Sequence, residues 1–177
     1  MIRNRISLTA LLIVTLLIGA CGEPTDDNGD PEDDNNDELT LEEEVCLHAA
    51  EDVPLGRTAS ASIDDVDPAD QNIGEPHTHF EIELPELDDN GEYAGYMAYD
   101  ADGGDFGLFT SIDLDVTFYD DNGDELADQP DVDAFDGCVE IEQQHSIELD
   151  DALYYVHFGP TSSDSVHTVT ERLDHDH

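Results

Sequence analysis

Apolar and polar residues alternate with a period of two along much of the chain beyond residue 76, which is typical of strands that bury one face. In the first of these segments Phe80 and Ile82 share one face, and Glu81 and Glu83 share the other. Together with a small-residue segment at 56–62, the expected strands are residues 77–84, 93–99, 106–111, 112–119, 139–149, 154–158 and 166–170. Asn-Gly pairs at 90–91 and 122–123 favour tight hairpin turns. We therefore expect an all-β domain built as an antiparallel β-sandwich of seven or eight strands.

Helix and loop signals are confined to a few segments. Thr40-Leu41-Glu42-Glu43 fits a capping box and predicts one short N-terminal helix from residue 41 to about residue 52. Residues 63–76, rich in Pro and Asp, are expected to form a loop. Residues 100–105, which contain three Asp and two Gly, are expected to separate two strands. The β-sandwich domain should span residues 41–172, followed by a His- and Asp-containing tail at 173–177.

The N-terminus has the layout of a secretory signal peptide at residues 1–20. Two arginines in the first five residues precede an apolar run that is too short for a permanent membrane span. Cys21 directly follows Ile18-Gly19-Ala20, and this arrangement resembles the lipobox of bacterial lipoproteins. The resemblance implies cleavage before Cys21 and acylation of that cysteine, which would anchor the mature chain to a membrane of the cell envelope. Gly22 rather than Asp comes next, which by the same resemblance favours the outer membrane; an ordinary signal peptide with a chance cysteine, or an uncleaved anchor, is the alternative.

Acidic residues dominate the charge of the chain. The sequence contains 47 Asp and Glu residues against 4 Lys and Arg residues, and only Arg57 and Arg172 follow residue 20. The acidic residues are spread through every later segment, which favours adaptation to high salt over a functional acidic surface for cations or a basic partner. The same charge makes nucleic acid and anionic lipid head groups poor partners. Residues 21–40 are acidic and nearly free of apolar side chains, and they are expected to form a disordered tether to the membrane.

Four segments of the β region, taken in order, resemble bacterial pre-peptidase C-terminal domains. They are residues 80–84, 96–100, 113–123 and 147–158. The resemblance implies a jelly-roll-like accessory module of a secreted protein. Asp150-Asp151-Ala152 departs from it, because the family usually has a Gly-containing turn there. The whole chain is also similar to uncharacterised exported bacterial lipoproteins.

With Cys21 acylated, Cys46 and Cys138 remain as an even pair. In an oxidising compartment such a pair is expected to form a disulfide bond. The alternatives are two buried free thiols and a pair of thiolate metal ligands. A disulfide bond would close a loop of roughly ninety residues, which the chain-entropy model values at about 4 to 5 kcal/mol.

Histidine is the residue type most able to carry chemistry in this chain. The eight histidines are His48, His77, His79, His145, His157, His167, His175 and His177. Zinc or copper needs neutral imidazoles that converge on one point at about 2.0 to 2.1 Å, often with a carboxylate. The first candidates as metal ligands are His48, His77 and His145, with His79 as a further candidate and the two tail histidines as a loose pair.

Different observations favour these candidates. His48 lies two residues after Cys46, so a disulfide bond to Cys138 would bring it near the strand that contains His145. His77 opens a strand, and His79 lies on the same face of it. His145 falls on the same alternate positions as the apolar Ile141 and Ile147, so its side chain should point toward the core. A buried imidazole needs a hydrogen-bond partner or a metal. The alternative interpretation is an ordinary solvent-facing strand and a core histidine that a backbone carbonyl satisfies.

No familiar catalytic motif occurs in the sequence, which lacks Gly-x-Ser-x-Gly, His-Glu-x-x-His and a phosphate-binding loop. We therefore expect a non-catalytic, membrane-anchored lipoprotein that displays a β-sandwich binding or interaction module to an unknown protein or envelope partner. The alternative is a periplasmic or surface lipoprotein that binds zinc or copper.

Overall fold

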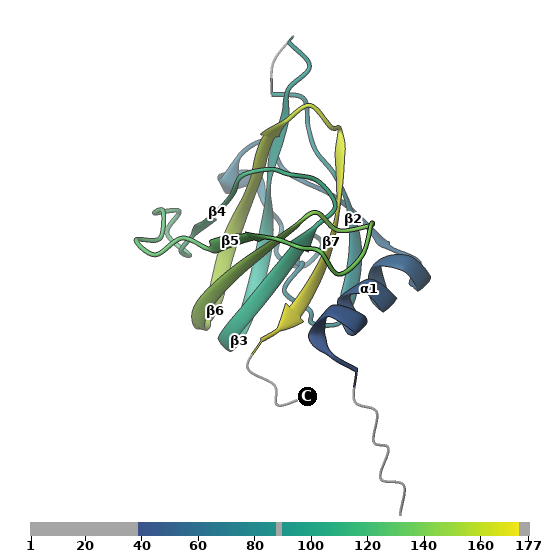
Figure 1. Ribbon diagram of the computed structural model, residues 1–177. Coiled ribbons are helices and arrows are strands. Elements are labelled where there is room, and N and C mark those ends of the chain that lie inside the picture. Colours follow the sequence, from purple (N-terminus) through teal and green to yellow (C-terminus); the bar gives the residue numbers. More distant parts are fainter. Residues whose placement is uncertain (1–38, 88–89, 174–177) are drawn as a thin grey trace, which may run out of the picture. The chain divides into compact units, whose positions relative to one another are not determined.

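The computed structural model describes residues 39–87 and 90–173 (Figure 1). The predicted signal peptide, the acylation site at Cys21, nearly all of the tether and the two tail histidines lie outside the described residues. Within the described ranges one helix, α1 (Leu41–Glu51), and one 3₁₀ turn, η1 (Ile63–Asp65), accompany seven strands. The strands are β1 (Leu55–Thr58), β2 (Thr78–Glu83), β3 (Tyr93–Thr110), β4 (Val116–Tyr119), β5 (Asp131–Ala134), β6 (Gln143–Thr161) and β7 (Ser165–Arg172). No helix in this part of the chain is long and apolar enough to cross a membrane.

The seven strands form one sheet in the order β1-β2-β7-β3-β6-β4, and β5 also pairs with β6. The structure is mostly β with one helix, as the alternating pattern predicts. The expectation of purely antiparallel pairing is wrong, because β1 and β2 run parallel while the other strand pairs run antiparallel. A parallel pair needs a long connection. Residues 59–77, which include η1, provide that connection.

The two longest strands, β3 and β6, pair with each other from Tyr93 opposite Thr161 to Thr110 opposite Gln143. The expected break at residues 100–105 is therefore wrong, since this segment is part of β3. Gly103 and Gly104 have φ angles of 83° and 125°, which residues with a Cβ rarely adopt. The Asp- and Gly-rich composition thus marks an irregularity within a paired strand rather than a connecting loop.

The buried face of β3 and of β6 changes parity at this irregularity. On β3 the buried side chains are Met97 and Tyr99 before the two glycines, and Phe106 and Leu108 after them. The corresponding residues of β6 are Ile147 and Leu149, then Tyr154, Val156 and Phe158. All of these side chains belong to one apolar cluster, so both halves of each long strand contribute to the same core.

A second, smaller apolar cluster lies between α1 and the sheet. It is formed by Val45, Phe109, Phe135, Ile141 and Val169. Phe109 follows Leu108 on β3 and points to the opposite face, so this stretch of the sheet is covered on both sides. Figure 1 shows α1 beside β2 and β7. The sequence also predicts Val139 as part of a strand at 139–149. This prediction is wrong, because β6 begins at Gln143 and Val139 is 94% exposed.

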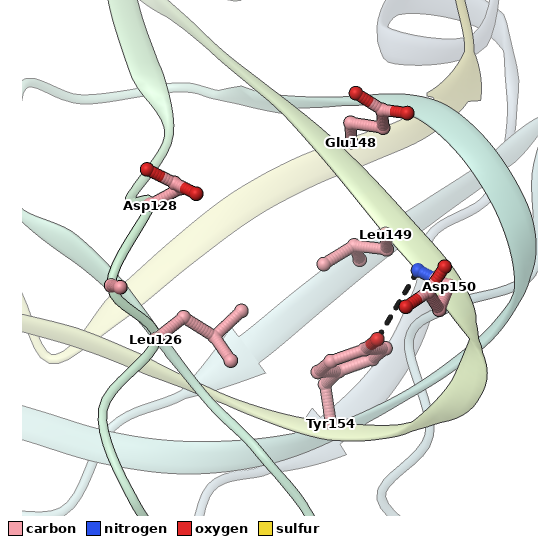
Figure 2. A pocket seen from close by; sticks show the side chains of 7 residues that line it. Leu126, Asp128, Glu148, Leu149, Asp150 and Tyr154 are labelled. Atoms are coloured by element: carbon pink, nitrogen blue, oxygen red, sulfur yellow. Dashed lines mark hydrogen bonds between the residues drawn. The ribbon is translucent and has the colours of Figure 1, made fainter.

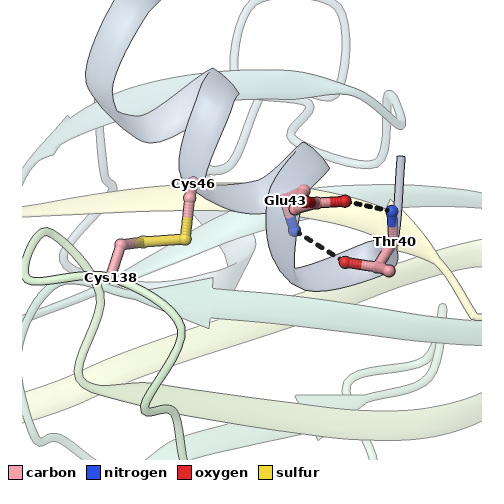
Figure 3. The surroundings of a disulfide bond; sticks show 4 residues. All are labelled: Thr40, Glu43, Cys46 and Cys138. Atoms are coloured by element: carbon pink, nitrogen blue, oxygen red, sulfur yellow. Dashed lines mark hydrogen bonds between the residues drawn. A yellow bond between two sulfur atoms is a disulfide. The ribbon is translucent and has the colours of Figure 1, made fainter. Parts of the chain in front are cut away.

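Helix α1 begins and is held in place as the sequence predicts. The Thr40 side chain accepts a hydrogen bond from the Glu43 backbone N–H, and the Glu43 carboxylate accepts one from the Thr40 N–H (Figure 3). Cys46 forms a disulfide bond with Cys138, with a Cα–Cα distance of 5.7 Å (Figure 3). The bond ties α1 to the connection between β5 and β6.

Salt is expected to stabilise this domain because few cations offset its carboxylates. Arg172 contacts the Asp102 carboxylate at 2.6 Å and the Gly103 carbonyl oxygen at 2.7 Å, and Arg57 is the other Lys or Arg residue after residue 20. Raising NaCl from about 10 mM to about 1 M shortens the screening length from about 30 Å to about 3 Å. We therefore expect the melting temperature to rise by well over 5 °C, as measured by circular dichroism at constant pH. KCl should act alike, and a flat response to both salts would show that carboxylate repulsion does not limit stability.

Candidate metal centre

Three elements bring His48, His77 and Glu171 together. β2 and β7 pair antiparallel with Thr78 opposite Thr170, so the residue before β2 lies beside the end of β7. The His77 backbone N–H donates to the Thr170 carbonyl oxygen at 2.8 Å, which fixes this start of β2 next to Glu171. His48 reaches the same point from the last turn of α1. One potential ligand atom from each of the three side chains lies within 4.8 Å of the other two.

Glu171 is the buried centre of this group. Its side chain is 1% exposed, and its oxygens lie 2.8 Å from His77 Nδ1 and 3.8 Å from His48 Nε2. Neither oxygen accepts a hydrogen bond of good geometry from the described residues. Burial raises the pKa of the Glu171 carboxyl group to about 7; His48 and His77 oppose this rise, and Glu44 adds to it. A buried carboxylate in this state needs a cation or a proton.

His48 is oriented by a second carboxylate. Its Nδ1 lies 2.6 Å from Asp52 Oδ2, one helical turn further along the chain. A proton on Nδ1 leaves the lone pair on Nε2, which is the atom turned toward Glu171. Metal-bound histidines usually have this arrangement, in which the outer ring nitrogen donates to a carboxylate or carbonyl.

His77 adopts an unusual backbone conformation at this site. Its φ angle is 55°, the one positive value among the described residues other than glycine. Such a conformation costs on the order of 1 to 3 kcal/mol and is concentrated at binding and active sites. It places the His77 ring 5.8 Å from the His48 ring, centroid to centroid.

His145 is not part of this group. It lies in β6, is fully buried and has its Nε2 3.4 Å from Thr110 Oγ1. Burial lowers its pKa to about 4, so it remains a neutral core side chain. The structure therefore brings together two of the first three candidates, His48 and His77, and replaces the third with Glu171.

His79 belongs to a neighbouring pair. Its Nε2 lies 3.1 Å from Nδ1 of His167 on β7. Burial, and then the charge of His167, lower the pKa of His79. A cavity of about 320 Å³ opens beside both rings, and Asp52 and Glu140 also line it.

Glu171 and His167, which both lie on β7, were not predicted as site residues from the sequence. They alternate with the core residues Val166, Thr168 and Thr170, so a half-buried strand would turn them toward solvent. Val169 lies on the same face of β7 as His167 and Glu171. An apolar residue at this position was the signal in the sequence that this face is also buried. Helix α1 provides that cover.

A second hollow, of about 340 Å³, lies beside the middle of β6 (Figure 2). Asp128, Glu148 and Asp150 contribute carboxylates to it, and the Asp150 backbone N–H donates to the Tyr154 hydroxyl oxygen at 3.2 Å. Its lining residues include no imidazole and no thiol. We therefore place the candidate site at the histidines beside α1.

The chain matches no protein-family model and no curated protein.

Proposed function

We propose that this chain is an exported, lipid-anchored protein of the cell envelope whose β domain binds a transition-metal ion. The observation that carries this proposal is the convergence of His48, His77 and the buried Glu171 within 4.8 Å. Two imidazoles and one carboxylate are a common ligand set for zinc. The Asp52 contact to the outer nitrogen of His48 supports the same assignment.

The ligand types favour Zn²⁺ or Cu²⁺ over other ions. Imidazole nitrogen suits zinc and copper, whereas Ca²⁺ and Mg²⁺ require oxygen ligands. Cys46 and Cys138 are joined to each other, so they contribute no thiolate. We assign binding rather than catalysis because the sequence carries none of the catalytic motifs that use such residues.

The proposal extends to the fold and to the role of the domain. Both halves of β3 and β6 line one core, which supports a strongly curved or folded sheet of the sandwich or jelly-roll kind. A displayed module of this kind can also bind a protein of the envelope. The metal centre is the more specific of the two proposals, because it names its ligand atoms.

Zinc titration of the full chain in a non-ionic detergent tests the metal centre. His77→Gln is expected to weaken the tightest zinc binding at least tenfold in calorimetry, since it removes a ligand. His175→Ala and His177→Ala should be present throughout, so that the tail does not capture metal. His157→Gln is the matched control, because the His157 ring packs against Tyr96, 4.5 Å between centroids, outside the group, and the change should leave the affinity unchanged. Equal losses in both variants, or no zinc binding at all, would refute the assignment.

The anchor has its own test. Mass spectrometry of the mature N-terminus is expected to find acyl chains on Cys21, with residues 1–20 removed. Cys21→Ala should release the protein from the membrane fraction, because acyl chains contribute about 0.8 kcal/mol per buried CH₂. An intact N-terminus or an unmodified Cys21 would contradict the lipoprotein proposal.

A further inference from the structure

His79 and His167 face each other across β2 and β7. His167 pairs with Glu81 in the sheet, so His79, two residues before Glu81, is its diagonal neighbour on the same face. Nε2 of His79 and Nδ1 of His167 are 3.1 Å apart, and the ring planes are inclined by 50°. His79 is 6% exposed, whereas the His167 side chain is 41% exposed. One ring is thus held by the core and the other borders solvent.

The outer nitrogens of the two rings lie in different surroundings. Nε2 of His79 faces His167, so Nδ1 is the outer nitrogen of His79, and this atom is buried with no hydrogen-bond partner among the described residues. Nε2 of His167 lies 3.9 Å from Glu81 Oε1, which favours a proton on that nitrogen.

One combination of tautomers turns two lone pairs toward each other. If both outer nitrogens carry the protons of neutral rings, Nε2 of His79 and Nδ1 of His167 are both acceptors at 3.1 Å. Two acceptors at this distance repel each other unless a cation lies between them. Two imidazole nitrogens at about 2.0 to 2.1 Å from one metal ion and 3.1 Å apart subtend about 100°, which is close to tetrahedral geometry.

We propose that His79 and His167 form a second site for a divalent transition metal, so that the domain holds two ions. Asp52 and Glu140 also line the cavity beside the rings, and water in this cavity can complete the coordination. Asp52 also contacts His48, so the two sites are neighbours. The ligand atoms of this second site differ from those of the first site. The second site can therefore bind metal even if the first site does not.

Counting bound zinc tests the second site. We use the full chain in a non-ionic detergent with His175→Ala and His177→Ala, saturate it with Zn²⁺, remove loose metal by gel filtration and measure zinc per chain. The expected ratios are two for this protein, one for His167→Gln, one for His77→Gln and none for the variant with both changes. His157→Gln, the matched control, should retain two.

The outcomes separate the two sites. An equal zinc ratio with and without His167→Gln overturns the second site and points to a proton shared by the two rings. A ratio of one that is lost in His167→Gln but kept in His77→Gln supports the second site and refutes the first. If His167→Gln does not fold, ¹⁵N spectra of the histidine rings in the protein with His167 intact decide. The His79 and His167 nitrogens must then shift together as zinc is added, and unchanged signals overturn the proposal.

Discussion

Replacing Cys46 and Cys138 together by alanine is expected to lower the free energy of unfolding by about 4 to 5 kcal/mol. The two cysteines are 92 residues apart, so the bond closes a long loop and removes much conformational entropy from the unfolded chain. Urea unfolding of the oxidised protein and of the variant, at the same salt concentration, measures the difference. The m-value should change as well, because the cross-linked unfolded chain is more compact.

Single replacements provide the control for this prediction. Cys46→Ala, Cys138→Ala and the reduced protein should each lose about as much stability as the double variant, since each lacks the same bond. The losses should not add, because removing the second sulfur has little further effect. A loss below about 1 kcal/mol would show that strain in the native state cancels the entropic gain.

The disulfide bond also links stability to the proposed function. Cys46 lies on α1 two residues before His48, and Val45 packs into the smaller cluster. Val45 is the one buried residue of the helix, the partly buried Leu41 and Ala49 pack against the same cluster, and the disulfide bond is the covalent link that holds this part of α1. Losing the bond should therefore loosen His48 and Asp52 and weaken zinc binding as well as stability.

The fold could be predicted from local pattern wherever one face of a strand is buried and the other exposed. Phe80 and Ile82 against Glu81 and Glu83 identify β2 in this way, and Tyr154, Val156 and Phe158 identify the second half of β6. Residues 100–105 could not be assigned, because Asp and Gly suit both a turn and an irregular strand. Pairing with β6 over the whole length of β3 decides between them, and that pairing depends on residues far away in the sequence.

The candidate site was predictable only in part, for a similar reason. The disulfide bond from α1 indicated that His48 returns to the sheet, and His77 at a strand end was a natural ligand. The sequence placed their partner at His145, since parity correctly makes that residue buried. The alternation of apolar and polar residues cannot show on which face of the sheet a side chain lies when both faces are buried. Glu171 lies on the face beneath α1, whereas His145 lies near Thr110.

Glu171→Gln is expected to make the metal-free protein more stable above pH 7. The folded-state pKa of Glu171 is about 7, raised by burial from an ordinary value of 4.5. Between these values the folded protein keeps a proton that the unfolded chain has lost, so stability falls as pH rises through this window. At about 1.4 kcal/mol per pKa unit, the full penalty above pH 7 is about 3 kcal/mol. Glutamine cannot ionise and avoids this penalty.

Urea unfolding in EDTA at pH 5 and pH 8 measures this effect. The stability of Glu171→Gln relative to the natural protein should rise between the two pH values by up to about 3 kcal/mol. Glu81→Gln is the matched control, because Glu81 lies on the neighbouring strand with its side chain half exposed and should show a small change. An equal pH response in both variants would show that Glu171 ionises normally in the folded protein.

Zinc is expected to reverse the order of the two proteins. A bound ion requires ionised Glu171 and neutral His48 and His77, so zinc binding releases protons and strengthens as pH rises. With zinc present at pH 8, the natural protein should become more stable by RT ln(1 + [Zn²⁺]/Kd), about 4.1 kcal/mol at one thousand times the dissociation constant, which exceeds the penalty of about 3 kcal/mol. Glu171→Gln should gain much less, because its amide is a poor metal ligand. The buried carboxylate thus destabilises the metal-free protein and favours metal binding. If zinc stabilises both proteins equally, Glu171 is not a ligand.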